Sequence, residues 1–144
     1  MSEADALARR VAEAMLAREG TGPAWSLVIE ETREGYARVS MRLRADMLNG
    51  HGIAHGGMIF SLADSAFAYA CNSRNETTVA QQASIAFLAP AQAGETLVAE
   101  ARETALTGRS GVYQVSVKSA DGRAIAEFTG LSRTTGGSVL VISD

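Results

Sequence analysis

Residues 58–71 run MIFSLADSAFAYAC and carry the clearest structural pattern in the chain. The segment is apolar almost all the way round a helix, with small residues interspersed and one carboxylate, Asp64, near its middle. A helix without a broad polar face is a buried helix. It is also too short to cross a bilayer, which takes about 20 residues. We therefore expect a central helix that protein surrounds on all sides.

The segments around this helix alternate between apolar and polar residues with a period of two. One alternation runs through residues 37–44, after a turn at Glu34-Gly35, and another runs through residues 113–118. This period is typical of a β-sheet with one buried face and one face in water. Further strands are predicted at residues 25–29, 78–88, 96–105 and 123–133.

The order of the predicted elements indicates one domain. An amphipathic helix is expected at residues 1–22, with Ser2 as its N-cap, and residues 135–144 are expected to form either a short extra strand or a flexible tail. The order is then helix, two strands, buried helix and four strands, which one antiparallel sheet curled around the buried helix satisfies. The chain is thus expected to be a single α+β domain of residues 1–144. Its exposed sheet edges favour pairing with a second copy.

Composition excludes several functional classes. The net charge of −3, without blocks of basic residues, offers no face to nucleic acid or to an anionic membrane. Cys71 is the only cysteine, so no intrachain disulfide can form, and its place in a buried helix favours inert packing. The two histidines lie in one loop, so we expect no metal site, and no separate cofactor is expected. The acidic start lacks the order of a signal peptide, which predicts a cytoplasmic protein.

Asp64 is the most informative residue for function. A lone carboxylate inside a buried helix costs on the order of several kcal/mol unless it is paired or hydrogen-bonded. Buried carboxylates with shifted pKa values concentrate at functional sites. The alternative is structural: Asp64 lies on a wet stripe of the helix, or it accepts hydrogen bonds from Ser61 or Ser65.

Residues 48–57, directly before the helix, are rich in glycine and contain both histidines of the chain, His51 and His55. Backbone N–H groups at a helix start lack intrahelical partners, and with the helix dipole they stabilise a carbonyl oxygen that gains negative charge. The chain has no Ser-His-Asp arrangement, nucleophile elbow, P-loop or dinucleotide motif. Acyl transfer at this helix start would therefore use Asp64, about two helical turns later.

Three motifs resemble the hotdog-fold acyl-CoA thioesterases: LNGHGIAHGG at residues 48–57, DSA at 64–66 and CNS at 71–73. The resemblance covers residues from about 24 to 134 and points to the branch associated with phenylacetate degradation. It implies a hotdog fold, in which a curved antiparallel sheet wraps a central helix. It also implies hydrolysis of an acyl-CoA thioester to free acid and coenzyme A, with aryl-acetyl groups, especially ring-hydroxylated phenylacetyl groups, as expected substrates.

The resemblance also implies roles for individual residues. Asp64 attacks the thioester directly or activates a water, and Gly57 presents its backbone N–H to the thioester carbonyl. Asn49 holds water or substrate, and His55 orders the loop and lies near the thioester. The coenzyme A moiety of the substrate is expected at Gly108, Arg109, Ser110 and Arg133.

One position departs from the family pattern. Some relatives place a serine early on the strand after the central helix, as a partner for the catalytic water. Ala80 occupies that position here, followed by Gln81 and Gln82, whose roles the sequence leaves open. For Arg109, an exposed turn residue without a binding role is the alternative.

Three other functions fit parts of the pattern. An enoyl-CoA hydratase or dehydratase of the same fold would use His55 and Asp64 as acid and base, but His55 stands beside paired glycines, as in the thioesterase pattern. A medium-chain fatty acyl-CoA thioesterase is the second alternative. The third, a non-catalytic acyl-CoA sensor, would not need the costly Asp64. In relatives two subunits share each site, so we expect a homodimer, assembled as a dimer of dimers (a homotetramer), with acyl-CoA as its substrate.

Overall fold

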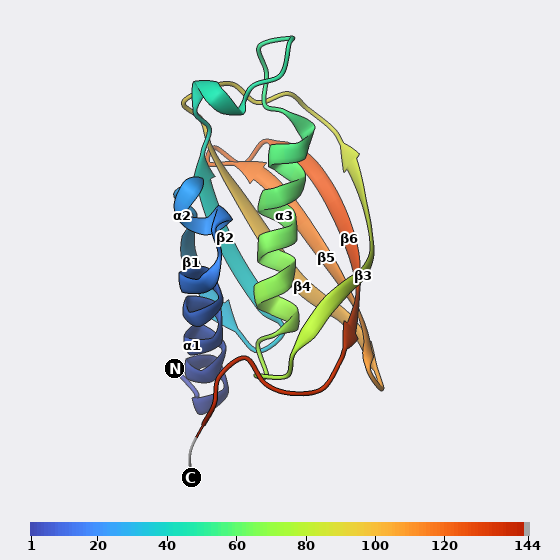
Figure 1. Cartoon of the computed structure of the whole chain (residues 1–144). Coiled ribbons are helices and arrows are strands. Elements are labelled where there is room, and N and C mark those ends of the chain that lie inside the picture. Colours follow the sequence, from blue (N-terminus) through green and yellow to red (C-terminus); the bar gives the residue numbers. More distant parts are fainter. Residues whose placement is uncertain (143–144) are drawn as a thin grey trace.

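The computed structural model describes residues 1–142 and contains the expected α+β architecture (Figure 1). Two helices come first, α1 (Glu3–Arg18) and α2 (Thr21–Ala24), followed by the strands β1 (Val28–Arg33) and β2 (Tyr36–Arg42). A short 3₁₀ turn, η1 (Ala45–Met47), leads to the central helix α3 (Gly56–Cys71). The remaining strands are β3 (Thr78–Phe87), β4 (Thr96–Thr107), β5 (Ser110–Ser119) and β6 (Ala124–Thr134).

The N-terminal segment differs in detail from its prediction. Ser2 caps α1, as expected, because its Oγ atom accepts a hydrogen bond from the Asp5 amide at 3.0 Å. The predicted single helix over residues 1–22 is in fact two helices, because the backbone becomes extended at Glu19 (φ −80°, ψ 138°). Local capping signals thus predicted where the helix begins but not where it breaks.

The six strands form one antiparallel sheet in the order β1-β2-β4-β5-β6-β3, which curves around α3 (Figure 1). Its concave face carries the apolar half of each alternating strand, including the fully buried Val39, Leu97 and Val115. Phe67 of α3 packs against Gly130 of β6 so closely that a Cβ atom on Gly130 would lie 2.7 Å from the ring. Only glycine fits there, and this contact fixes the middle of α3 against the sheet.

The two edges of the sheet differ. α1 packs along β1, where Arg9 donates a hydrogen bond to the Ile29 carbonyl oxygen at 3.1 Å. No further strand pairs with the outer edge of β3 in the described part of the chain, and Val79 on this strand is about half exposed. An unpaired strand edge is a surface for further strand pairing. The free edge of the sheet is therefore β3.

One stripe of α3 stays open in the single chain. Gly57 is exposed, and Ser61, Asp64, Ser65 and Ala68 are only half-buried. The expectation that protein surrounds this helix on all sides therefore fails within one chain. Asp64 lies at the boundary between the core and the solvent.

The segment after β6 forms neither strand nor helix over residues 135–142. Asn75 binds both backbone groups of Leu140: its Nδ2 donates to the carbonyl oxygen at 3.1 Å, and its Oδ1 accepts from the amide at 2.7 Å. The last two residues of the predicted tail, 143 and 144, lie outside the described residues. No helix within residues 1–142 is both long and apolar enough to span a bilayer.

Candidate active site

His55 is the N-cap of α3 and shapes the start of the helix. Its Nδ1 atom accepts a hydrogen bond from the Gly57 amide at 2.9 Å. The Gly56 amide, one residue earlier, meets no acceptor among the described residues. A free N–H at a helix start can bind a carbonyl oxygen that gains negative charge. The amide available to a ligand is thus that of Gly56, whereas the amide of Gly57, the predicted donor, is occupied by the His55 ring.

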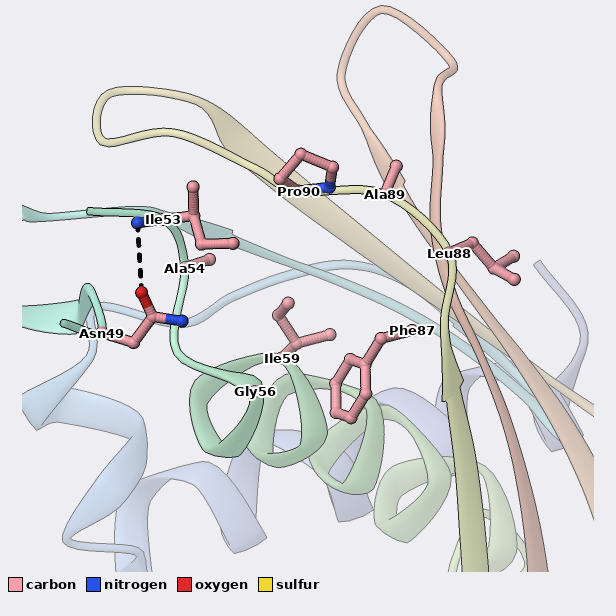
Figure 2. Close-up of a pocket in the computed structure, with 9 residues that line it drawn as sticks. All are labelled: Asn49, Ile53, Ala54, Gly56, Ile59, Phe87, Leu88, Ala89 and Pro90. Atoms are coloured by element: carbon pink, nitrogen blue, oxygen red, sulfur yellow. Dashed lines mark hydrogen bonds between the residues drawn. The ribbon is translucent and has the colours of Figure 1, made fainter. Parts of the chain in front are cut away.

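Asn49 closes the glycine-rich loop through its side chain. Its Oδ1 atom accepts hydrogen bonds from the amides of His51 (2.9 Å) and Ile53 (3.3 Å). The Nδ2 group remains as a donor, and nothing in residues 1–142 accepts from it. Figure 2 shows Nδ2 on the side that faces Gly56 and Ile59. The loop and the helix start therefore present two N–H donors to one space.

A pocket of about 460 Å³ opens beside these donors (Figure 2). Its walls come from two segments, the glycine-rich loop with the start of α3, and the stretch of chain at the end of β3. The lining residues are Asn49, Ile53, Ala54, Gly56, Ile59, Phe87, Leu88, Ala89 and Pro90. An apolar pocket with a few convergent polar groups suits an apolar acyl group whose polar end meets the donors.

Phe87, at the end of β3, lies over the start of α3. A Cβ atom added to Gly56 would lie 3.0 Å from the Cζ atom of the Phe87 ring. Glycine at this position therefore leaves room for both the ring and a substrate next to the backbone. The Phe87 side chain is 54% exposed, so a ligand in the pocket can reach the ring.

Asp64 has no hydrogen-bond partner in the described part of the chain. The structural explanation that Asp64 accepts hydrogen bonds from Ser61 or Ser65 is therefore not supported. Ser61, a suggested partner, instead donates to the Gly57 carbonyl oxygen at 2.8 Å. Burial raises the pKa of Asp64 above the usual carboxyl range, because the charged form loses contact with water. A carboxylate with a raised pKa is a stronger base than an ordinary one.

Asp64 and the Gly56 amide cannot act on the same carbonyl group within one chain. The two residues are eight positions apart on α3, which corresponds to about 12 Å at 1.5 Å per residue. The Gly56 N–H points out of the helix start, away from Asp64, and Asp64 does not line the pocket. One chain therefore holds two separate halves of a site.

The predicted coenzyme A residues lie together, at the opposite end of the sheet from the pocket (Figure 1). Gly108, at φ +60°, and Arg109 form the β4–β5 turn, and the strand register pairs Ser110 with Arg133. Arg109 and Arg133 are exposed, and no carboxylate of residues 1–142 forms an ion pair with either. Neighbouring free guanidinium groups suit phosphate groups.

The region around this site matches a known protein family. Residues 51–126 match the family model of the Thioesterase superfamily, and this range includes His55, Gly56 and Asp64. The chain belongs to the thioesterase superfamily. It is 41% identical to the acyl-coenzyme A thioesterase PaaI of Escherichia coli K12 over 128 residues, which are 89% of this chain and 91% of that protein.

Solved structures support the same family. The E. coli PaaI protein from the phenylacetic acid degradation operon has a TM-score of 0.91 at 40% identity, and the match covers 93% of this chain and 97% of that chain. A mutant of the phenylacetic acid degradation protein PaaI from Thermus thermophilus has a TM-score of 0.78 at 38% identity, over 81% and 100% of the two chains. A hypothetical thioesterase protein from Streptococcus pneumoniae, solved with coenzyme A, has a TM-score of 0.75 at 26% identity, and the match covers 78% of this chain and 90% of that chain. The predicted hotdog fold is confirmed.

The second wall of the thioesterase pocket was not among the residues predicted from the sequence. The wall is the run FLAP at residues 87–90, and its signal was available, because an apolar run ending in Pro90 interrupts the alternation of β3. Its importance depends on contacts with the helix start, which the sequence does not display.

Cys71 and the start of β3 were also singled out from the sequence. Burial raises the pKa of the Cys71 thiol to about 12, so the thiol stays neutral, in agreement with the predicted inert role. The β3–β6 register shifts between Ala80 and Gln82, which makes Gln81 the extra residue of a β-bulge. All three β3 residues are exposed in the single chain.

Proposed function

We propose that this thioesterase hydrolyses aryl-acetyl thioesters of coenzyme A, with phenylacetyl and ring-hydroxylated phenylacetyl groups as preferred acyl groups. The observation that carries the proposal is an apolar pocket with the free donors of Asn49 and Gly56 on one side. An aromatic ring fits the apolar part, and the thioester carbonyl fits the donors. The PaaI relatives that are named for phenylacetic acid degradation support the same acyl group.

In the proposed reaction, the Gly56 amide donates to the thioester carbonyl oxygen as this atom gains negative charge. Asp64 either attacks the carbonyl carbon or takes a proton from an attacking water. Both routes break the C–S bond, consume one water and release the free acid and the thiol of coenzyme A. Both also require Asp64 in its charged form, and His55 keeps the helix start in place through its bond to Gly57.

The proposed site is completed by a second copy of the chain. Within one chain, Asp64 is about 12 Å from Gly56, and Arg109 lies at the end of the sheet away from the pocket. A two-fold axis that pairs two β3 edges antiparallel reverses these ends, so that Asp64 and Arg109 of the second copy lie near Gly56 of the first. The free edge of β3 and the open stripe of α3 support this homodimer, and a dimer of such dimers is the expected assembly.

A panel of acyl-CoA thioesters, read by release of free thiol, tests the proposed function. We expect phenylacetyl-CoA and hydroxyphenylacetyl-CoA to be cleaved with a kcat/KM about tenfold or more above that of octanoyl-CoA, because a ring fills the pocket better than a flexible chain. A preference for octanoyl-CoA would replace the aryl-acetyl assignment by the medium-chain one. An enoyl-CoA in the same panel detects a hydratase, which would remove the conjugated double bond without releasing thiol.

Arg109→Ala is expected to raise the KM for phenylacetyl-CoA about tenfold and to leave kcat unchanged, because a phosphate contact binds substrate and transition state equally. Arg10→Ala is the matched control, since Arg10 is exposed and has no ion-pair partner in residues 1–142 either. Phenylacetyl-pantetheine, which lacks the nucleotide, should show the same KM with wild type and Arg109→Ala. An unchanged KM for phenylacetyl-CoA would mean that Arg109 is an ordinary turn residue.

A further inference from the structure

One side chain outside the site contacts the end of the acyl-pocket wall, where Pro90 lies, whereas the Leu88 and Ala89 amides donate to the Ile125 carbonyl oxygen of β6 at 2.8 and 3.3 Å. The wall is the run at residues 87–90, of which Leu88, Ala89 and Pro90 belong to the stretch between β3 and β4. Arg123, in the β5–β6 turn, donates from one guanidinium nitrogen to the Pro90 carbonyl oxygen at 3.1 Å. The same nitrogen contacts both carboxylate oxygens of Glu95, at 3.0 and 3.2 Å.

Glu95 connects the Arg123 contact to other parts of the stretch between β3 and β4. Its carboxylate accepts a hydrogen bond from the Gln92 amide at 2.6 Å, and its backbone carbonyl accepts from the Leu43 amide at 2.8 Å. The hydrogen bond from the Gln92 amide and the Arg123 ion pair lower the pKa of Glu95, so its carboxylate stays charged at neutral pH. Arg123 and Glu95 therefore fix the segment from Pro90 to Glu95, which begins at the last residue of the wall.

The segment from Pro90 to Glu95 also contacts the loop directly before α3. Between Pro90 and Gln92, the carbonyl oxygen of the fully buried Ala91 accepts a hydrogen bond from the Ala54 amide at 2.8 Å. Ala54 directly precedes His55, the N-cap residue, and the free amide of Gly56. A shift of this segment would therefore move the apolar wall and the free amide of Gly56 together.

We propose that Arg123 is a positioning residue that sets acyl-group selectivity, because it holds the Pro90 wall at a fixed distance from Gly56. This inference rests on the proposed function. Arg123 is 43% exposed and Glu95 is 26% exposed. Ion pairs this exposed contribute little to stability, so an effect on selectivity can be separated from an effect on folding.

The test compares kcat/KM for phenylacetyl-CoA and acetyl-CoA in the wild type and in Arg123→Ala. An acetyl group is much smaller than a phenylacetyl group and should depend less on the position of Pro90, so the ratio of the two values should fall by roughly tenfold in the variant, within the range that a misplacement of about 1 Å produces. A merely less stable enzyme loses active molecules, which lowers both values equally and leaves the ratio unchanged. Arg123→Lys keeps the charge and one contact, and it should recover part of the ratio.

Arg9→Ala is the matched control. Arg9 also joins an exposed carboxylate, that of Glu13 at 2.6 Å, to a backbone carbonyl oxygen, that of Ile29 at 3.1 Å, but at the opposite edge of the sheet from β3. Its ratio should equal that of the wild type. An unchanged ratio in Arg123→Ala, or an equal fall in Arg9→Ala, would overturn the inference. A wild type that cleaves neither thioester would instead refute the proposed function, without any need for the variants.

Discussion

The Asp64→Asn enzyme is expected to fold and assemble normally and to lose about 10² to 10⁴ in kcat, because the general base is removed while its shape is kept. If Asp64 is the nucleophile, the loss is larger, since no covalent route remains. The measurement is thiol release from phenylacetyl-CoA at saturating substrate. Asp64→Glu keeps the charge but shifts it by one methylene, and we expect it to retain more activity than Asn. Normal turnover in Asp64→Asn would remove Asp64 from the mechanism.

The same substitution has an expected signature in stability. The pKa of Asp64 is raised in the folded protein by burial, so the charged form is disfavoured there. Its contribution to stability is therefore present below the unfolded pKa and is lost as pH rises through the folded pKa. Asp64→Asn should thus be more stable than the wild type at neutral pH, and the difference should shrink in acid. Thermal unfolding of both proteins at neutral and at acidic pH measures this difference in stability. Wild-type activity should fall as acid protonates Asp64, and this fall should begin above the usual carboxyl range.

Mixing two inactive variants is expected to restore activity. Asp64→Ala lacks the carboxylate, and Gly56→Pro lacks the free amide at a first helical position, where proline is best tolerated. If each site combines Gly56 of one subunit with Asp64 of the other, a hybrid dimer carries one intact site and one doubly altered site. After subunit exchange, each hybrid should show about half of the wild-type activity. Thiol release measured before and after exchange gives the result.

The control is a mixture of the same two proteins without subunit exchange, which should stay inactive. A site contained within one chain predicts no recovery after exchange either. Gly57→Pro, tested in place of Gly56→Pro, identifies which amide is the donor. In the wild type, the Gly57 N–H donates to His55 Nδ1. Gly57→Pro should therefore act through the loss of this helix cap, and it should lower turnover less than Gly56→Pro does. An active monomer at micromolar concentration would contradict the shared site.

Local patterns in the sequence were enough to predict most of the fold. The period of two in residues 37–44 and 113–118 predicted strands, because alternate side chains of a strand face opposite sides of a sheet. The apolar run at residues 58–71 predicted the central helix, and Ser2 predicted where α1 begins. These signals depend on neighbouring residues alone. The break in the N-terminal helix was not predicted, and the open stripe of α3 was named only as an alternative explanation for Asp64, because the exposure of a helix face depends on what packs against it.

For the candidate site, the sequence by itself determined the chemical groups. A carboxylate at Asp64 and glycines at the start of α3 follow from composition and spacing, and the family resemblance adds the amide of Asn49. Only the tertiary structure decided which of them are available. The His55 ring turns onto the Gly57 amide and leaves that of Gly56 free, and the sequence does not show which of its staggered rotamers a side chain adopts.

The tertiary structure also decided what lies together. The wall ending in Pro90 meets the helix start, and Arg123 reaches that wall across 33 positions of sequence. Contacts between distant segments follow from how the sheet curves around α3, and no local pattern encodes them. The same geometry separates Asp64 from Gly56 along one rigid helix by about 12 Å. A single chain therefore contains every group of the proposed site, and the length of the helix keeps those groups apart.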